Sequence, residues 1–251
     1  MVKTFSNIMP RSVFCALGNW SSAEFSVLKK AIGQAGFEFD ETFSGLEHDD
    51  RMPNSFEVSA DLVHYSFTEE DLRAIESHGG VAYFLAPRVK RREDLEPMMT
   101  KSLIFIKRLF NEFGVTALKA ESQGIAHGRS RWVALSESCA NAPSRSCLYY
   151  AFVRRPIGTE YGLHSCGLHL FGLPDVLYSY DATQESAEDA SKNIDSIANI
   201  VFKANGNFED ITQEINASEL AKRNSRLIEC KFYEEDAFLY NPYGYIYVYD
   251  E

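Results

Sequence analysis

The sequence predicts a mixed α+β fold: a mixed β-sheet with flanking helices, parallel strand–helix–strand units in the first half and more antiparallel pairing in the second. In the first half, short apolar runs alternate with segments of helical periodicity, which indicates strand–helix–strand units. In the second half, two apolar runs stand on either side of Asn241-Pro242, which is typical of a hairpin. The 251 residues contain no Pro/Gly/Ser-rich linker, so we expect a single domain over residues 1–251.

Apolar runs and helical periodicity define the elements of the first half. Buried strands are expected at 12–17, 55–63, 81–87 and 115–120, where the residues are apolar or alternate. Helices are expected at 21–36, 68–80 and 92–112, because their apolar residues recur at spacings of three and four. Ser21 or Ser22 and Thr68 are suitable N-caps, since their hydroxyls can accept hydrogen bonds from backbone N–H groups.

The second half contains longer apolar runs and glycine-rich turns. We expect a short helix at 132–139 and a strand at 147–157. Its antiparallel partner, or a strand that leads into a glycine-rich turn, is expected at 159–172. A helix is expected at 186–206, where Ser186 and Asp189 resemble a capping box. Strands at 226–235 and 243–251 are expected to form the C-terminal hairpin.

Charged residues are unevenly distributed along the chain. The net charge of −11 divides into −7 over residues 1–87, +7 over 88–155, −2 over 156–180 and −9 over 181–251. The blocks either compensate one another across the folded surface or form an acidic face that steers a basic partner. The negative total disfavours general nucleic-acid binding, because phosphates require a basic surface.

Cysteine usage and hydropathy indicate the compartment. The five cysteines are odd in number and scattered, so we expect free thiols and a reducing environment. No run approaches the roughly 18 apolar residues of a membrane span. The N-terminus has no long apolar stretch and no small-residue cleavage site, which makes a signal peptide unexpected. We therefore expect a cytoplasmic protein that does not bind membranes.

The segment ESQGIAHGRSRW (121–132) follows a predicted strand and is the densest in polar side chains. Its glycines would let the backbone approach a ligand closely. Arg129 and Arg131, with backbone N–H groups of the following helix, would suit an anion. Glu121 and His127 would suit an acid–base pair. The third interpretation is a structured turn whose Glu and His bond to neighbouring backbone groups.

The segment GLHSCGLHLFGLPD (162–175) contains His164, Cys166, His169 and Asp175. The spacing His-x-Cys-x-x-His resembles a metal triad in residue type, but no fourth ligand follows and the spacing matches no zinc module. Cys166 with His169 is a conceivable nucleophile pair that Asp175 would orient. The alternative is a cysteine buried for packing alone. The Walker A, Gly-x-Gly-x-x-Gly, His-Glu-x-x-His and Gly-x-Ser-x-Gly motifs do not occur.

Four stretches together resemble a family pattern. They are DDRM at 49–52, ESQGIAHGR at 121–129, SCGLHLFGLPD at 165–175 and YNPYG at 240–244. They resemble an uncharacterised bacterial family of unknown function, whose members carry similar glycine-rich stretches in the same order. The resemblance implies a bacterial cytosolic origin and transfers no activity. If the family shares a site, the resemblance implies these positions of the chain: Glu121, His127, Cys166, His169 and Asp175.

These observations favour a protein-binding protein over an enzyme, and specifically an acidic, immunity- or antitoxin-like inhibitor of a basic bacterial toxin. The charge distribution, the missing enzyme signatures and the tyrosine-rich last strand support it. Contacts with the partner are expected from Glu209, Asp210, Glu234, Glu235, Asp236, Tyr243 and Tyr245.

The alternative is an enzyme or a protein that binds a small anion. Its site would be formed by the 121–131 and 164–175 segments, with Glu121, His127, Arg129, Arg131, Cys166, His169 and Asp175 as candidate residues. We expect no metal, no cofactor and no nucleic-acid partner.

Overall fold

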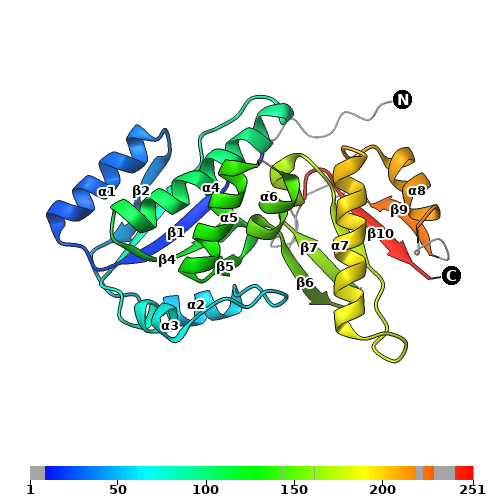
Figure 1. Ribbon diagram of the computed structural model, residues 1–251, viewed down its shortest axis with the longest axis horizontal. Coiled ribbons are helices and arrows are strands. Elements are labelled where there is room, and N and C mark those ends of the chain that lie inside the picture. Colours follow the sequence, from blue (N-terminus) through cyan, green and yellow to red (C-terminus); the bar gives the residue numbers. More distant parts are fainter. Residues whose placement is uncertain (1–8, 143, 161, 219–222, 229–240, 251) are drawn as a thin grey trace. The chain divides into compact units, whose positions relative to one another are not determined.

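The computed structural model describes residues 9–142, 144–160, 162–218, 223–228 and 241–250. The chain forms two compact units, shown in Figure 1. One unit is Arg11–Phe152, and the other combines Met1–Pro10 with Val153–Glu251. We call them the 11–152 unit and the 153–251 unit and describe each by itself. The predicted α+β fold class is confirmed, and the prediction of a single domain stays a prediction.

The 11–152 unit is built on a five-stranded sheet. Its strands are β1 (Val13–Gly18), β2 (Glu38–Gly45), β3 (Gly80–Leu85), β4 (Val115–Ala120) and β5 (Ile125–His127), in the order β2-β3-β1-β4-β5. Every neighbouring pair is antiparallel. The order matches the ferredoxin-like split β–α–β arrangement, with an added edge strand.

The prediction of parallel pairing in the first half is therefore wrong. Helix α1 (Ser22–Gln34) joins β1 to β2, and helix α4 (Leu95–Glu112) joins β3 to β4, as the alternation of elements indicated. In the sheet, however, β3 lies between β1 and β2, and β1 lies between β3 and β4. Sequence periodicity identifies the crossover helices, but it does not show that another strand inserts between the strands they join.

Helices cover both faces of this sheet (Figure 1). On one face, Phe105 of α4 stacks on Phe37, and both rings contact Phe84 of β3. The opposite face holds α2 (Met52–Val58) and α3 (Glu69–Glu76), whose apolar side chains pack against β1, β3 and β4. The core of the unit thus consists of two apolar layers separated by the sheet.

Several predicted elements of this unit are confirmed, and two are wrong. Ser21 caps α1 and Thr68 caps α3, as expected, and the helix predicted at 132–139 is α5 (Arg129–Asn141). The predicted strand at 55–63 is instead largely α2 and a loop, because Met52 and Phe56, four residues apart, both face the core. The predicted strand at 147–157 begins as helix α6 (Arg145–Phe152).

The 153–251 unit has its own five-stranded sheet. The strands are β6 (Arg154–Thr159), β7 (Gly162–Cys166), β8 (Asp175–Tyr178), β9 (Asn224–Ile228) and β10 (Tyr245–Tyr249), in the order β6-β7-β8-β10-β9. Only the β8–β10 pair is parallel among the described strands. The pairing of the last two strands is confirmed. The expectation that the second half is more antiparallel than the first is wrong, because the described pairs of the first sheet are all antiparallel and the parallel pair lies in the second sheet.

Helix α7 (Ala187–Lys203) packs on β6, β7 and β8, and α8 (Phe208–Asn216) packs on β9. Ser186 caps α7, as predicted, whereas α8 was not expected from the sequence. The remaining short helices are η1 (Arg92–Asp94), η2 (Glu121–Gln123) and η3 (Leu168–Phe171). The four described cysteines are free thiols, as expected. In the part of the chain that the structure describes, none of the helices has the length and apolarity to cross a lipid bilayer.

Candidate functional site

The segment 125–129 holds a second segment, 59–71, at the edge of the first sheet. Ala126 donates its backbone N–H to the carbonyl of Ser59 at 2.7 Å, and its carbonyl accepts from the N–H of Asp61 at 3.2 Å. The two segments form an isolated parallel bridge at this point. The chain after α2 is therefore attached to β5 as a short additional edge.

A buried carboxylate then fixes the chain that follows. The Oδ1 atom of Asp61 accepts hydrogen bonds from the backbone N–H groups of Val63 at 3.0 Å and His64 at 3.1 Å. Its Oδ2 atom lies 3.8 Å from Nδ1 of His127, and the side chains of the pair are 1% and 0% exposed. The start of this loop is thus connected to the interior of the unit through one side chain.

The same motif also fixes the other end of the loop. The N–H of Gly128 donates to Oγ of Ser66, and the N–H of Arg129 donates to Oδ1 of Asp71, both at 3.0 Å. The Oδ2 atom of Asp71 accepts from both the N–H and the hydroxyl of Thr68. One buried carboxylate therefore caps the N-termini of α3 and α5 together.

Gly128 is required by the closeness of this contact. A Cβ atom at this position would lie 2.2 Å from the carbonyl oxygen of Ser66 and 2.8 Å from Oδ2 of Asp71. Any larger residue would therefore push the 59–71 segment away from β5. The glycine that suggested approach to a ligand instead permits approach of the chain to itself.

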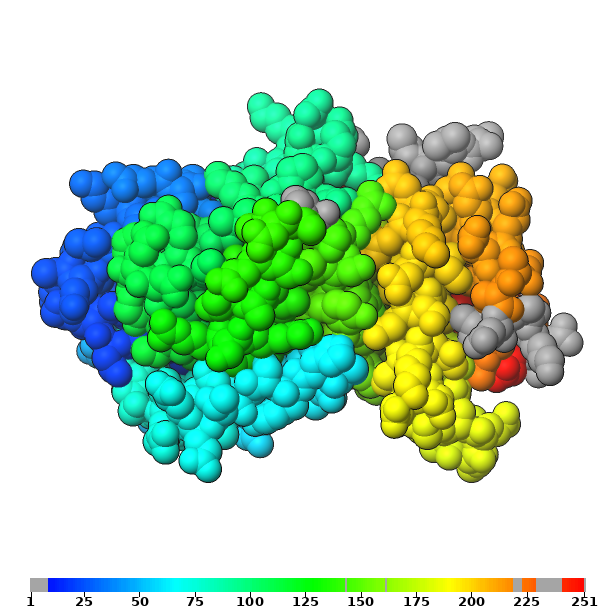
Figure 2. Space-filling model, in the orientation of Figure 1, coloured from blue at the N-terminus to red at the C-terminus, as the bar shows by residue number. Residues whose placement is uncertain are grey.

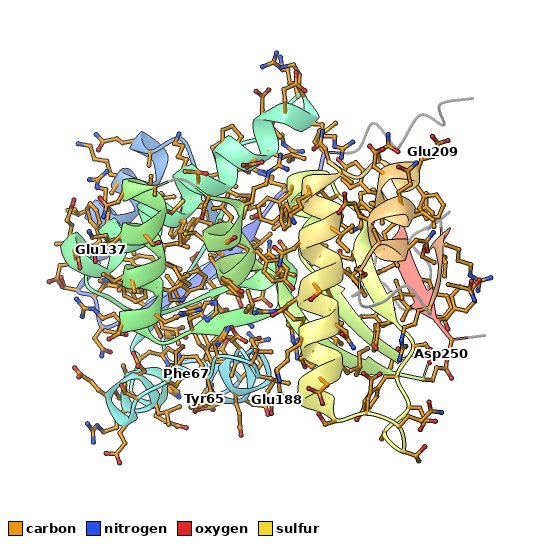
Figure 3. The ribbon with its side chains drawn as sticks, turned by 45° about the vertical axis from the view of Figure 1, so that its right-hand side comes forward. Tyr65, Phe67, Glu137, Glu188, Glu209 and Asp250 are labelled. Carbon is orange, nitrogen blue, oxygen red and sulfur yellow. The ribbon has the colours of Figure 1, made fainter. Side chains whose placement is uncertain are left out.

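Residues 62–65 form what we call the display loop, because it is held at both ends while the side chains of Leu62, His64 and Tyr65 are exposed. Leu62 is 67% exposed and Tyr65 is 61% exposed. The Tyr65 ring rests edge-on against Phe67 with centroids 5.8 Å apart, and Figure 3 shows both residues beside α2 and α3. Figure 2 shows this part of the chain, in cyan, on the surface.

The display loop lies within a segment that is both acidic and apolar. Residues 38–76, which we call the acidic–apolar segment, contain 12 Asp and Glu against 2 Arg, a net charge of −10. Of the eight large hydrophobic side chains that are exposed among the described residues, six belong to it: Phe43, Leu46, Val58, Leu62, Tyr65 and Leu72. Exposed carboxylates flank the loop in sequence, at Glu57, Glu69 and Glu70.

The remaining predicted residues of the 121–131 segment have structural contacts. Glu121 pairs with the buried Lys119 at 2.9 Å, so the structure pairs Glu121 and His127 with different residues rather than with each other. The guanidinium of Arg129 donates to the carbonyl of Phe110 at 3.2 Å. Arg131 is half-buried. These contacts fit the structured-turn interpretation of the motif.

The 165–175 segment forms a second buried network around Asp175. Its Oδ1 atom accepts from the hydroxyl of Ser165 at 2.9 Å and the N–H of Leu168 at 3.0 Å. Its Oδ2 atom accepts from the amide of Asn241 at 2.7 Å and lies 3.5 Å from Nδ1 of His169. The carboxylate therefore fixes the turn that contains η3 and joins it to the chain before β10.

The predicted nucleophile and metal ligands of this segment are buried. Burial raises the pKa of the Cys166 thiol, so the thiolate that a nucleophile needs is disfavoured. Burial also lowers the pKa of His164, which keeps that imidazole neutral. No three His, Cys, Asp or Glu side chains of the described residues are grouped as metal ligands would be.

The two segments of the alternative site belong to different units. The 121–131 segment lies in the 11–152 unit and the 164–175 segment in the 153–251 unit. A joint enzyme or anion site formed by both stays a prediction.

The predicted partner contacts at the C-terminus differ in exposure. Glu209 and Asp210 are exposed in the first turn of α8, where Asn207 caps both of their N–H groups. Tyr243 and Tyr245 are 3% and 7% exposed and belong to the core of their unit. Glu234, Glu235 and Asp236 lie outside the described residues.

Comparisons with protein-family models, with curated proteins and with solved structures found no match for this chain. The resemblance of the two glycine-containing motifs to a bacterial family therefore stays a prediction. The display loop was missed because the alternation at 55–63 indicated a strand. A signal was present in the sequence: Leu62 and Tyr65 stand in a strongly acidic stretch, where apolar residues are not needed for a helix face.

Proposed function

We propose that this chain is a protein-binding protein that uses the acidic–apolar segment, and above all the display loop, to bind a basic protein. It acts in the cytoplasm as an inhibitor of the immunity or antitoxin type, with a basic toxin as its target. The observation that carries this proposal is that, of the eight large hydrophobic side chains exposed among the described residues, six lie in a segment of net charge −10.

Each part of that surface has a physical role in binding. Exposed Tyr65 is a suitable anchor, because a few buried side chains, with Tyr among the most frequent, carry most of an interface's energy, and exposed Leu62 adds apolar area that a partner can bury. The surrounding carboxylates attract a basic partner and exclude an acidic one. The hydrogen bonds at both ends of the loop reduce the ordering cost of binding, because the loop is already fixed.

The proposal is tested by affinity purification of the tagged full chain from its host at low salt, beside a variant that carries Leu62→Ser and Tyr65→Ser. A stoichiometric basic protein should co-elute with the wild type, dissociate at high salt and be absent from the variant eluate. Equal retention of that protein by both chains would place its binding site elsewhere and overturn the proposal. A matched control replaces the two large hydrophobic side chains that are exposed outside the segment in the described part of the chain, Val27→Ser and Ile104→Ser, and should retain the partner.

A further inference from the structure

His127 is buried between two oxygen atoms that can only accept hydrogen bonds in their usual states. Its Nδ1 atom lies 3.8 Å from Oδ2 of Asp61, and its Nε2 atom lies 3.2 Å from the carbonyl oxygen of Ala151 in α6. The perpendicular Trp132 ring, with its centroid 4.7 Å away, restricts the imidazole plane. The ring therefore faces a carboxylate, a carbonyl and an indole from three different elements.

A neutral imidazole does not fit both oxygens. It has one N–H donor and one lone pair, so one of its nitrogens would direct a lone pair at an acceptor. An imidazolium has two N–H donors. One donates from Nε2 to the Ala151 carbonyl, and the other faces the Asp61 carboxylate in an ion pair at 3.8 Å, which is longer than a hydrogen bond. The buried carboxylate of Asp61 supplies the opposite charge that a buried cation requires, because an unpaired buried charge is strongly destabilising.

We infer that His127 is held as a buried imidazolium, and that this cation positions the display loop and makes its anchoring dependent on pH. A continuous series of contacts connects the ring to the loop. His127 contacts the Ala151 carbonyl of α6 on one side and the Asp61 carboxylate on the other, and that carboxylate accepts from the N–H groups of Val63 and His64. The inference rests on the proposed function where it concerns binding. The charge of the ring is a property of the chain without its partner.

Two changes of protonation would weaken the anchor. Loss of one N–H from the imidazolium would remove the donor that His127 directs at either Asp61 or Ala151. Protonation of Asp61 would neutralise the carboxylate that accepts from the loop N–H groups. The display loop is therefore fixed most firmly when His127 is cationic and Asp61 is anionic, and binding of a partner should be strongest in that state.

The test is a long-range ¹H–¹⁵N correlation spectrum of the full chain at pH 8, which distinguishes an imidazolium from either neutral tautomer. An ordinary histidine titrates near about 6.5 and is neutral at this pH, so a cationic His127 would stand apart. The same spectrum of Asp61→Asn should show His127 as a neutral ring. His64→Gln, which removes an exposed imidazole of the display loop, is the matched control and should leave the His127 signals unchanged.

A neutral His127 in the wild type at pH 8 would overturn the inference. A ring that remains imidazolium in Asp61→Asn would overturn the role of Asp61. Should Asp61→Asn fail to fold, the wild-type spectrum alone still decides the charge of the ring. These outcomes need no partner, so a failure here is distinguishable from a failure of the proposed function, which the purification experiment measures.

Discussion

The two glycine-containing motifs of this chain, 125–129 and 165–175, have similar compositions, but their hydrogen bonds hold different parts of the chain. The 165–175 segment turns all of its polar groups inward, around the buried carboxylate of Asp175. Residues 125–128 are buried too, but hydrogen bonds from the 125–129 segment go to a different stretch of chain, residues 59–71, and hold that stretch with Leu62 and Tyr65 exposed. The difference teaches that a motif rich in polar residues can support a functional surface without forming part of it.

Replacement of Asp175 by Ala should have the largest effect on stability. The change leaves the N–H of Leu168, the Asn241 amide and the Ser165 hydroxyl without their acceptor in the core. The expected cost is about 3–5 kcal/mol, since each buried unsatisfied group costs roughly 1–3 kcal/mol. Denaturant unfolding monitored in the 153–251 unit measures it. A cost below about 1 kcal/mol would mean that this network is not what holds the η3 turn.

Gly128→Ala should have the next largest effect on stability. It tests the 125–129 motif without changing the 165–175 motif. The added methyl group would overlap the Ser66 carbonyl, so the display loop must move, at an expected cost of about 1–3 kcal/mol. Gly33→Ala in α1 is the matched control, because nothing lies within 4 Å of its Cβ position. That control should stabilise the helix by about 0.5–1 kcal/mol. Thermal unfolding measures the change in stability of both variants. The prediction is contradicted if both variants are stabilised or both are destabilised.

Leu62→Ser with Tyr65→Ser should affect binding and not stability. Both side chains are exposed, so the free energy of unfolding should change by no more than about 0.5 kcal/mol. The affinity for the partner should fall by roughly 30-fold or more, as expected when two anchors of an interface are truncated. Titration calorimetry with the purified partner measures the loss. A large fall in stability would show that the loop side chains belong to the fold instead.

The smallest expected effect concerns the acidic side chains around the loop. Glu57→Gln, Glu69→Gln and Glu70→Gln together should slow association several-fold and flatten its dependence on salt, while dissociation changes little. The comparison variant is Glu209→Gln with Asp210→Asn, on α8 of the other unit. Stopped-flow mixing at two salt concentrations measures the association rates of both variants and their dependence on salt. A larger effect on α8 would move the partner surface to the 153–251 unit.

Much of the fold could be predicted from the sequence, because its cues are local. Ser21, Thr68 and Ser186 cap helices as expected, and the apolar runs at 81–87 and 115–120 are strands. The errors arose where tertiary packing overrides a local pattern. Met52 and Phe56 lie on one face of α2 and pack against the sheet, and this contact between distant parts of the chain was not evident from the local sequence.

The candidate site was harder to predict for a related reason. His127 and Asp71 act on residues roughly 60 positions away in the chain, and no spacing rule connects them. The sequence singled out His127 as an acid–base residue and Arg129 as an anion ligand, or the segment as a structured turn, but it did not indicate which distant part of the chain that turn holds. Leu62 and Tyr65 are exposed because they lie in the loop between the end of α2 and the start of α3. The alternation at 55–63 predicted a strand there and therefore did not indicate this loop.

Hydrogen exchange of the display loop tests most directly whether the 125–129 motif holds it in place. The backbone N–H groups of Val63 and His64 should be protected in the wild type, although the side chains of Leu62 and Tyr65 are exposed. Protection should be lost in Gly128→Ala and retained in Gly33→Ala. Exchange of these two amides at the rate of an unfolded chain in the wild type would contradict the account, because the loop would then be neither fixed nor prepared for a partner.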